Sequence, residues 1–286
     1  MPDARQTRLA VLGSPIAHSK SPRLHHAAYR ELGLEWSYEA VEVAGKDLPG
    51  FIRGLGAEWR GLSLTMPLKR DVLPLLTRQD ELVDLTGGAN TVLITDDGLA
   101  GFNTDVYGLV EALRGSGVVR VSAVQVIGAG ATAASVLAAV ASLGAREVLI
   151  TARSPEKASA LLELAERLGM TATATGLSGR GSVTEFIADL VVSTLPGGTD
   201  VNLVLPADVL SGGTLLDVAY EPWPTPLAAR FLDAGGSVIS GLEMLVNQAL
   251  AQVRIFLTGS PRTPLNDEAR VLQAMRASIG PAPSSR

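Results

Sequence analysis

The chain contains no cysteine among its 286 residues. This absence excludes disulfide bonds, thiolate metal sites and a cysteine nucleophile, and it agrees with a cytoplasmic protein. Histidine is almost as rare. The chain has three histidines, and all of them lie between positions 18 and 26. Two of them, His25 and His26, are adjacent, so on a helix their side chains would diverge by about 100°. We therefore expect no metal site.

An excess of positive charge is also missing. The chain has 24 Lys and Arg residues against 29 Asp and Glu residues, a net charge of −5 and a pI near 5.3. We therefore do not expect a nucleic acid or an anionic membrane as the main partner. A local basic site for a small anion is compatible with this net charge. Hydrophobic residues make up 47% of the chain, which is enough for a full core.

Long apolar segments are few. The first residues, MPDARQTRLAVLG, lack the apolar run of a signal peptide, so we expect no leader. The segment from Val121 to Ala145 carries no charge and is about as long as a membrane span. It contains Gln125 and a central GAGA, however, which indicates a strand, a tight turn and a helix. We expect no membrane span.

Strand-like and helix-like segments alternate in two series. The first contains RLAVLG, WSYEAVEV, WRGLSLTMP and TGGANTVLIT, and DDG predicts a hairpin turn after the last of these. The second contains SAVQVIGAG, EVLITAR, DLVVSTLPGG, TLLDVAY and GSVISG. This alternation predicts an α/β fold with parallel sheets covered by helices. Residues 1–106 and 107–240 would form two domains, and periodicity leaves the last helices open to either.

Several helices carry end signals. SPRLHHAAYRELGL is predicted to be a helix with Ser21 as its cap, Pro22 at its first position and Gly33 at its exit. SPEKASALLELAERLG is predicted to be a helix opened by Ser-Pro-Glu, and GLEMLVNQALAQVRIFLTG a long closing helix.

The stretch VQVIGAGATAAS has the spacing of a dinucleotide-binding turn. Gly128, Gly130 and Ala133 form G-x-G-x-x-A between a predicted strand and a predicted helix. The first glycine permits a tight turn, the second lets the backbone approach a pyrophosphate, and the small third residue lets the helix pack on the strand. The alternative is a glycine turn that serves packing only.

The end of the next strand indicates which cofactor binds. An NAD site usually has Asp or Glu there, to bind the ribose 2′-hydroxyl. This chain has Arg153 and Ser154, followed by Lys157, and such donors suit a 2′-phosphate. We therefore expect NADP(H), while an exposed arginine without a ligand is the alternative.

Two residues are candidates for the proton transfer that accompanies a hydride transfer. Lys69 follows a strand in LSLTMPLKR, and Asp105 precedes a helix in GFNTD. A lysine near a carboxylate can donate a proton to a developing alkoxide. Taken alone, Lys69 is more often a solvated lysine and Asp105 a helix cap, and the sequence does not show that they meet.

A set of separated motifs makes a more specific match than one nucleotide loop. In chain order they are GSPIAHSKSPRLHH, SLTMPLK, GGANTV, GFNTD, VIGAGATA, DVAYEPWPTPL and GLEMLVNQA. With these motifs over nearly its whole length, the chain resembles the shikimate dehydrogenase family. The resemblance implies reversible, NADPH-dependent reduction of 3-dehydroshikimate to shikimate, within chorismate and aromatic amino acid biosynthesis.

The resemblance also implies the roles of individual residues. Lys69 and Asp105 would be the catalytic pair. Ser19 and Ser21 would bind the substrate carboxylate, and His18 and His25 would be structural. Tyr220 would lie close to the substrate. The hydroxyl groups of the substrate would contact the remaining substrate-binding residues, which are Thr65, Lys69, Asn90, Asp105 and Gln248. Small neutral donors suit a polyol acid, because each hydroxyl that leaves water needs a partner.

The same resemblance implies the domain assignment. Residues 1–106 with 241–286 would form the substrate-binding catalytic domain, because the last helices return to it, and residues 107–240 a Rossmann-like NADP-binding domain. The active site would lie in the cleft of a monomer or homodimer. The implied cofactor-binding residues are Gly128, Ala129, Gly130, Ala131, Ala133, Arg153, Ser154, Lys157, Ser193, Thr194 and Gly241.

The chain departs from the family pattern at three places. Ser63 replaces the asparagine of NVT, Ala152 replaces the asparagine of NRT, and STLPGG replaces NATS.G. Each departure puts one substrate or cofactor contact in doubt, and none removes a proposed catalytic residue. Two alternatives stay open: a quinate/shikimate dehydrogenase with broader substrate and NAD(P) use, and a non-catalytic nucleotide sensor.

Overall fold

The chain divides into two compact units. The computed structural model describes residues 7–177, 186–199 and 203–280, apart from the side chain of Lys157. The first unit contains the described residues up to Gly108 and those from Leu245 onward, and the second contains Leu109–Met244. The division passes through two helices, α5 (Asp105–Gly115) and α10 (Gly241–Thr258).

The first unit is built on a six-stranded sheet. Its strands follow the order β2-β1-β3-β5-β6-β4. Their bounds are Arg8–Gly13 (β1), Ser37–Glu42 (β2), Trp59–Leu64 (β3), Arg78–Gln79 (β4), Thr91–Thr95 (β5) and Gly98–Phe102 (β6). Strand β1 is parallel to β2 and β3, but β5 is antiparallel to both β3 and β6. The prediction of parallel sheets therefore holds for β1, β2 and β3 of this unit but not for β5, which is antiparallel to both of its neighbours.

The exception has a local cause, which the sequence contained. The predicted DDG hairpin is confirmed, because β5 and β6 pair up to Thr95 and Gly98 across this turn. A two-residue connection joins antiparallel strands, whereas a parallel pair needs a crossover of a dozen or more residues. The hairpin therefore reverses the strand direction inside the sheet.

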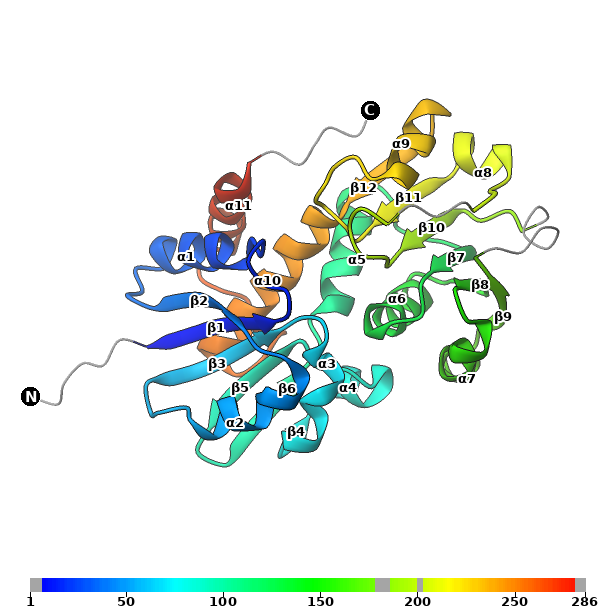
Figure 1. The fold of residues 1–286 in the computed structure, drawn as a ribbon. Helices are drawn as coiled ribbons and strands as arrows, with labels where there is room; N and C mark the ends of the chain where they lie inside the picture. The colour runs from blue at the N-terminus through cyan, green and yellow to red at the C-terminus, as the bar shows by residue number, and fades with distance from the viewer. Residues whose placement is uncertain (1–6, 178–185, 200–202, 281–286) are drawn as a thin grey trace, which may run out of the picture. The chain divides into compact units, whose positions relative to one another are not determined.

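Helices cover both faces of this sheet (Figure 1). Adjacent residues of β1 point to opposite faces: Leu9 and Val11 join one apolar cluster, and Ala10 and Leu12 the other. The first cluster is completed by α1 (Ser21–Glu31), α10 and α11 (Glu268–Ile279), and α1 packs beside α11. The second cluster is completed by α2 (Leu48–Arg53), α3 (Leu68–Asp71), η2 (Leu73–Leu75) and α4 (Glu81–Thr86), while the short η1 (Gly45–Asp47) before α2 contributes no residue to it. The return of the last helices to the first part of the chain is thus confirmed.

The start of α1 differs from its prediction. Ser21 is already the first helical residue, Pro22 the second, and the residue at the cap position is Lys20. Ser21 is therefore not a side-chain cap. Its own N–H donates to the hydroxyl of Ser19 at 3.3 Å, so Ser19 accepts from the first turn instead. Gly33 ends the helix with a φ of 68°, as predicted.

The second unit contains a fully parallel sheet in the order β12-β11-β10-β7-β8-β9. The strands are Ala123–Ile127 (β7), Glu147–Ala152 (β8), Thr171–Gly176 (β9), Leu190–Ser193 (β10), Thr214–Asp217 (β11) and Ser237–Ser240 (β12). Helices α6 (Ala131–Ser142) and α7 (Ser159–Arg167) lie on one face (Figure 1), and α8 (Ala207–Gly212) and α9 (Pro226–Asp233) pack on the other. The helix predicted at SPEKASALLELAERLG begins as a 3₁₀ turn, η3 (Pro155–Ala158), and becomes α-helical at Ser159.

The uncharged segment from Val121 to Ala145 contains β7, the glycine turn and α6, as predicted. Within the described ranges, every helix is too short or too polar to cross a membrane.

The packing of α10 on the sheet depends on a glycine in β3. A Cβ added at Gly61 would lie 2.6 Å from Cε1 of Phe256 and 2.7 Å from the carbonyl oxygen of Val92. Phe256 is fully buried in α10. The missing side chain of Gly61 thus makes room for the aromatic ring of the returning helix.

We expect Gly61→Ala to lower the free energy of unfolding by about 1–3 kcal/mol, because the added methyl group overpacks the core. Chemical unfolding of the variant would measure this loss. Gly115→Ala is the matched control, because a Cβ there would meet no described heavy atom within 4 Å apart from its chain neighbours and the backbone of its own helix. Equal stability of Gly61→Ala and the wild type would show that Phe256 is not held this tightly.

Candidate active site

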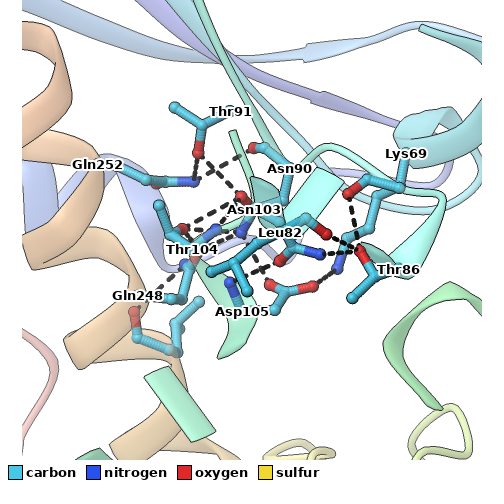
Figure 2. A network of polar contacts seen from close by, with 12 residues as sticks. Lys69, Leu82, Thr86, Asn90, Thr91, Asn103, Thr104, Asp105, Gln248 and Gln252 are labelled. Carbon is cyan, nitrogen blue, oxygen red and sulfur yellow. Dashed lines mark hydrogen bonds and ion pairs between the residues drawn. The ribbon is translucent and has the colours of Figure 1, made fainter. Parts of the chain in front are cut away.

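Lys69 and Asp105 form an ion pair at one edge of the first unit's sheet. The Nζ of Lys69, in the short helix α3, donates to Oδ2 of Asp105, the first residue of α5 (Figure 2). Only 14% of the lysine side chain and 5% of the aspartate side chain are exposed. Lys69 is therefore not a solvated surface lysine, and Asp105 is not a helix cap. The capping oxygen belongs to Asn103, whose Oδ1 accepts from the Asp105 N–H at 3.0 Å.

Strand register explains why these residues meet. Ser63 in β3 pairs with Thr91 in β5, and Thr91 pairs with Phe102 in β6. The end of β3, the start of β5 and the end of β6 therefore lie at one edge of the sheet. Lys69 follows β3, Asn90 precedes β5 and Asp105 follows β6. All three therefore lie at this edge.

Asn90 connects the groups at this edge. It is 2% exposed, and its Nδ2 lies 2.8 Å from Oδ1 of Asp105, 2.9 Å from Oγ1 of Thr104 and 3.0 Å from Oε1 of Gln248. Its Oδ1 accepts from the Thr104 N–H at 2.8 Å and from the Thr91 hydroxyl at 2.9 Å. The two carboxylate oxygens of Asp105 are thus divided between Lys69 and Asn90.

Gln248 reaches this site from the returning helix α10. Its Oε1 lies near Asn90 and 3.3 Å from the Thr104 hydroxyl, and its Nε2 donates to the Leu245 carbonyl oxygen at 3.3 Å. Gln248 and Asp105 are thus both partners of the Asn90 amide nitrogen (Figure 2). The structure therefore brings together four of the predicted site residues: Lys69, Asn90, Asp105 and Gln248.

The remaining predicted residues of the first unit lie in the neighbouring loops. Ser21 is 5% exposed, while Ser19 and Thr65 are half-buried. A Cβ at Gly13 would collide with the side chain of Thr65, and the Ser14 N–H donates to the Met66 carbonyl oxygen at 3.0 Å. The loops after β1 and β3 therefore touch. Joint binding of one substrate by Ser19, Ser21 and Thr65 stays a prediction.

A buried polar group adjoins Asn90 through Gln252, which the sequence analysis did not identify. Gln252, on α10, is 2% exposed, and its Nε2 lies 3.1 Å from the Thr91 hydroxyl. Its Oε1 lies 3.0 Å from the Ser63 hydroxyl and 3.2 Å from Nε2 of His25. The available signal was a second glutamine one helical turn after Gln248, on the same side of the helix.

His25 is fully buried in this group, in line with its predicted structural role. Its ring stacks on Tyr38 at 3.8 Å, and its Nδ1 lies 3.1 Å from the Tyr29 hydroxyl. Burial lowers the pKa of His25 to about 3, because the ring loses the solvation of its charged form. Ser63, the residue at the departure from NVT, accepts from the Tyr38 hydroxyl at 2.7 Å.

The glycine loop of the second unit fits a dinucleotide. Gly128 is buried with a φ of 115°, and a Cβ there would collide with the Thr194 hydroxyl, which donates to the Ile127 carbonyl oxygen at 3.0 Å. Gly130 is exposed at the cap of α6, and a Cβ there would find open space among the described residues. Ala133 is fully buried. The loop thus leaves room for a ligand at the N-terminus of a twelve-residue helix.

The other predicted cofactor residues have diverse settings. Arg153 is exposed directly after β8, and Ser154 lies at the N-cap position of η3 without a capping side-chain hydrogen bond. The side chain of Lys157 lies outside the described part of the chain. Ser193, at the end of β10, is buried and hydrogen-bonded to Asp217. Ala129 and Ala131 flank Gly130, and Gly241 begins α10. Tyr220 is half-buried after β11, and its approach to a substrate stays a prediction.

Among the described residues, no group of three His, Cys, Asp or Glu side chains could hold a metal ion.

Comparison with known proteins connects both units to one family. Residues 11–92 match the model of the shikimate dehydrogenase substrate binding domain. A curated relative from Thermus thermophilus, named shikimate dehydrogenase (NADP(+)), is 35% identical over 275 residues, which cover 96% of this chain and 99% of the relative.

Two solved structures extend the similarity to the fold. The shikimate dehydrogenase of Mycobacterium tuberculosis is 38% identical, with a TM-score of 0.78 over 95% of this chain and 99% of that one. The Thermus thermophilus shikimate 5-dehydrogenase, solved in complex with NADP(H) and shikimate, is 33% identical, with a TM-score of 0.79 over 96% and 100%.

The low pKa of His25 predicts an acid-sensitive stability. The folded state resists protonation of the ring until about pH 3, whereas the unfolded chain binds this proton near pH 6.5. The contribution of the neutral ring is therefore complete above pH 6.5 and decreases as the pH falls toward 3, by about 1.4 kcal/mol per pH unit.

We expect His25→Gln to remove this dependence, because glutamine does not titrate and can still donate toward Gln252. Denaturant unfolding of wild type and variant between pH 4 and 6.5 would compare the two slopes. Carboxylates titrate in both proteins, so their contribution cancels in the comparison. Identical slopes would show that the buried ring does not resist protonation.

Proposed function

The chain belongs to the shikimate dehydrogenase family, and from that premise we propose that it interconverts 3-dehydroshikimate and shikimate with NADP(H), while Lys69 and Asp105 handle the proton. The observation that carries the catalytic assignment is the shielded Lys69–Asp105 ion pair, oriented by Asn90. A nucleotide sensor would not need such an acid–base pair beside a set of neutral donors.

The proton step follows from the arrangement of the pair. NADPH, when bound, supplies a hydride to the carbonyl carbon of the substrate. The ammonium group of Lys69 donates a proton from Nζ to the carbonyl oxygen as negative charge develops there, and in the reverse direction Nζ takes the proton of the alcohol. Asp105 keeps Nζ in place through Oδ2, and Asn90 orients the carboxylate through Oδ1.

The neutral residues around the pair suit the remaining groups of the substrate. The amides of Asn90 and Gln248 each offer donors and an acceptor, which hydroxyl groups require in a site without water. Thr65 contributes a further hydroxyl from the loop after β3. The hydroxyls of Ser19 and Ser21 bind the carboxylate, while a contact of Tyr220 with the substrate stays a prediction.

The second unit has the features required to hold NADP(H). Gly128, Ala129, Gly130, Ala131 and Ala133 would hold the pyrophosphate at the turn before α6, where the helix N-terminus offers free N–H groups. Arg153 offers a planar, exposed guanidinium to the 2′-phosphate, with Ser154 next to it and Lys157 four positions after it in sequence. Ser193, Thr194 and Gly241 complete the cofactor site. The proposal includes a cytoplasmic location, with which a chain without cysteine agrees. It also includes a monomer or homodimer.

The reaction and the cofactor choice are tested together by following reduced cofactor by absorbance, with shikimate or quinate and with NADP or NAD. We expect fast reduction with shikimate and NADP only.

Arg153→Ala should raise the KM for NADP far more than that for NAD, because only NADP carries the 2′-phosphate. Arg167→Ala, an exposed arginine of the same unit, is the control.

Each other result has a distinct meaning. Comparable turnover of quinate or with NAD would favour a quinate/shikimate dehydrogenase. Silence in all four assays would favour the nucleotide sensor. Equal losses with NADP and NAD would show that Arg153 does not bind the 2′-phosphate.

Lys69→Ala should lower kcat by ~10²–10⁴-fold, the contribution typical of a proton-transfer residue, with a modest change in the KM for shikimate. Steady-state kinetics would measure both constants. Lys46→Ala, which removes an exposed lysine of the same unit, should leave kcat unchanged. A kcat of Lys69→Ala within a factor of two of the wild type would remove Lys69 from the mechanism.

A further inference from the structure

A path of hydrogen bonds leads from the Asp105 carboxylate to the interior of the first unit. Asp105 contacts Asn90, Asn90 contacts Thr91, and Thr91 contacts Gln252 (Figure 2). Beyond Gln252 the path divides to His25 and Ser63. All of these residues apart from Gln252 lie in the first 105 positions. The returning helix α10 therefore contributes one side chain to the path, and that side chain connects Thr91 to His25 and Ser63.

The orientation of the Gln252 amide follows from its partners. On one side it faces the Asn90 carbonyl oxygen at 3.3 Å, which can only accept, so the nitrogen Nε2 must lie there. On the other side Oε1 must then accept from both Ser63 and His25. His25 therefore carries its proton on Nε2, and its Nδ1 accepts from the Tyr29 hydroxyl. The group has one consistent set of donors and acceptors.

The same reasoning fixes the orientation of Asn90. The Thr91 hydroxyl accepts from Nε2 of Gln252, so its single proton is directed to Oδ1 of Asn90. With Oδ1 held on this side, Nδ2 of Asn90 faces the carboxylate of Asp105. A reversed amide would place a carbonyl oxygen against that carboxylate, which is repulsive.

We propose that Gln252 is a positioning residue of the site, which acts through Thr91 to hold the Asn90 amide, and thereby Asp105 and Lys69, in the reactive arrangement. This inference rests on the proposed dehydrogenase function. The path orients groups and does not conduct protons, because the amide nitrogen of Gln252 donates but does not accept a proton. Its neutral His25 end supplies a fixed donor to the amide oxygen.

The test uses shikimate oxidation by the full-length protein with Gln252→Met, Thr91→Val and the double variant. Methionine and valine keep similar volume and remove the hydrogen bonds. We expect each single variant to lower kcat/KM for shikimate by roughly 10- to 100-fold, the effect of a slightly misplaced reacting group. The KM for NADP should change less than twofold, because the glycine loop belongs to the other unit.

The double variant separates positioning from general packing. If Gln252 acts through Thr91, the double variant loses no more activity than the more affected single variant. Losses that multiply would overturn the proposal, and so would wild-type kinetics of Gln252→Met. Gln273→Met, at an exposed position of α11, controls for the substitution itself.

Two further results remain distinguishable. If Gln252→Met fails to fold by circular dichroism, Thr91→Val decides alone: a tenfold loss supports the proposal, and wild-type kinetics overturn it. If the wild-type protein does not oxidise shikimate at all, the proposed function fails, whereas an active wild type with unaffected variants refutes only the role of Gln252.

Discussion

The hydrogen bonds of the Asn90 side chain are the constraint on which the rest of the site depends. A buried amide is costly unless its nitrogen and oxygen both find partners. In this chain the nitrogen faces Asp105 and Gln248, and the oxygen faces Thr91 and the backbone of Thr104. Satisfying one side chain therefore ties together the start of β5, the loop before α5 and the helix α10.

The sheet of the first unit, which mixes parallel and antiparallel strands, brings these partners together. Because β5 runs against β3 and β6, its first residue pairs with the end of each neighbour. In a parallel arrangement the start of β5 would lie at the opposite edge, and Asn90 would be far from Lys69 and Asp105. The hairpin that breaks the parallel pattern is thus also what assembles the acid–base pair with its orienting amide.

The site contains a pair of opposite charges, whereas the buried group around His25 and Gln252 is neutral. Lys69 and Asp105 keep opposite charges together in a largely shielded place, where each compensates the other's loss of water. Deeper in the first unit, His25 contacts Tyr29 and Gln252 rather than a carboxylate among the described residues, and burial keeps its ring neutral. A neutral, single-tautomer histidine gives the Gln252 amide a constant donor over the range in which an exposed histidine would titrate.

The sequence by itself determined the features that depend on neighbours in the chain. The α/β class, the Gly128 loop between a strand and a helix, the DDG hairpin and the exit of α1 at Gly33 all follow from local spacing and backbone conformation. Family motifs added the candidates Lys69, Asn90, Asp105 and Gln248. The 3.6-residue and two-residue periodicities are local, and for that reason they can be read without the fold.

Only the tertiary structure decided which distant residues meet. It paired β5 with β3, placed Lys20 rather than Ser21 at the cap position of α1 and brought Lys69 to Asp105. It also placed Gln252 beside Thr91, 161 positions away. A hydrogen bond between such residues leaves no periodic trace in the sequence, because its geometry is set by strand register and by the docking of α10 on the sheet.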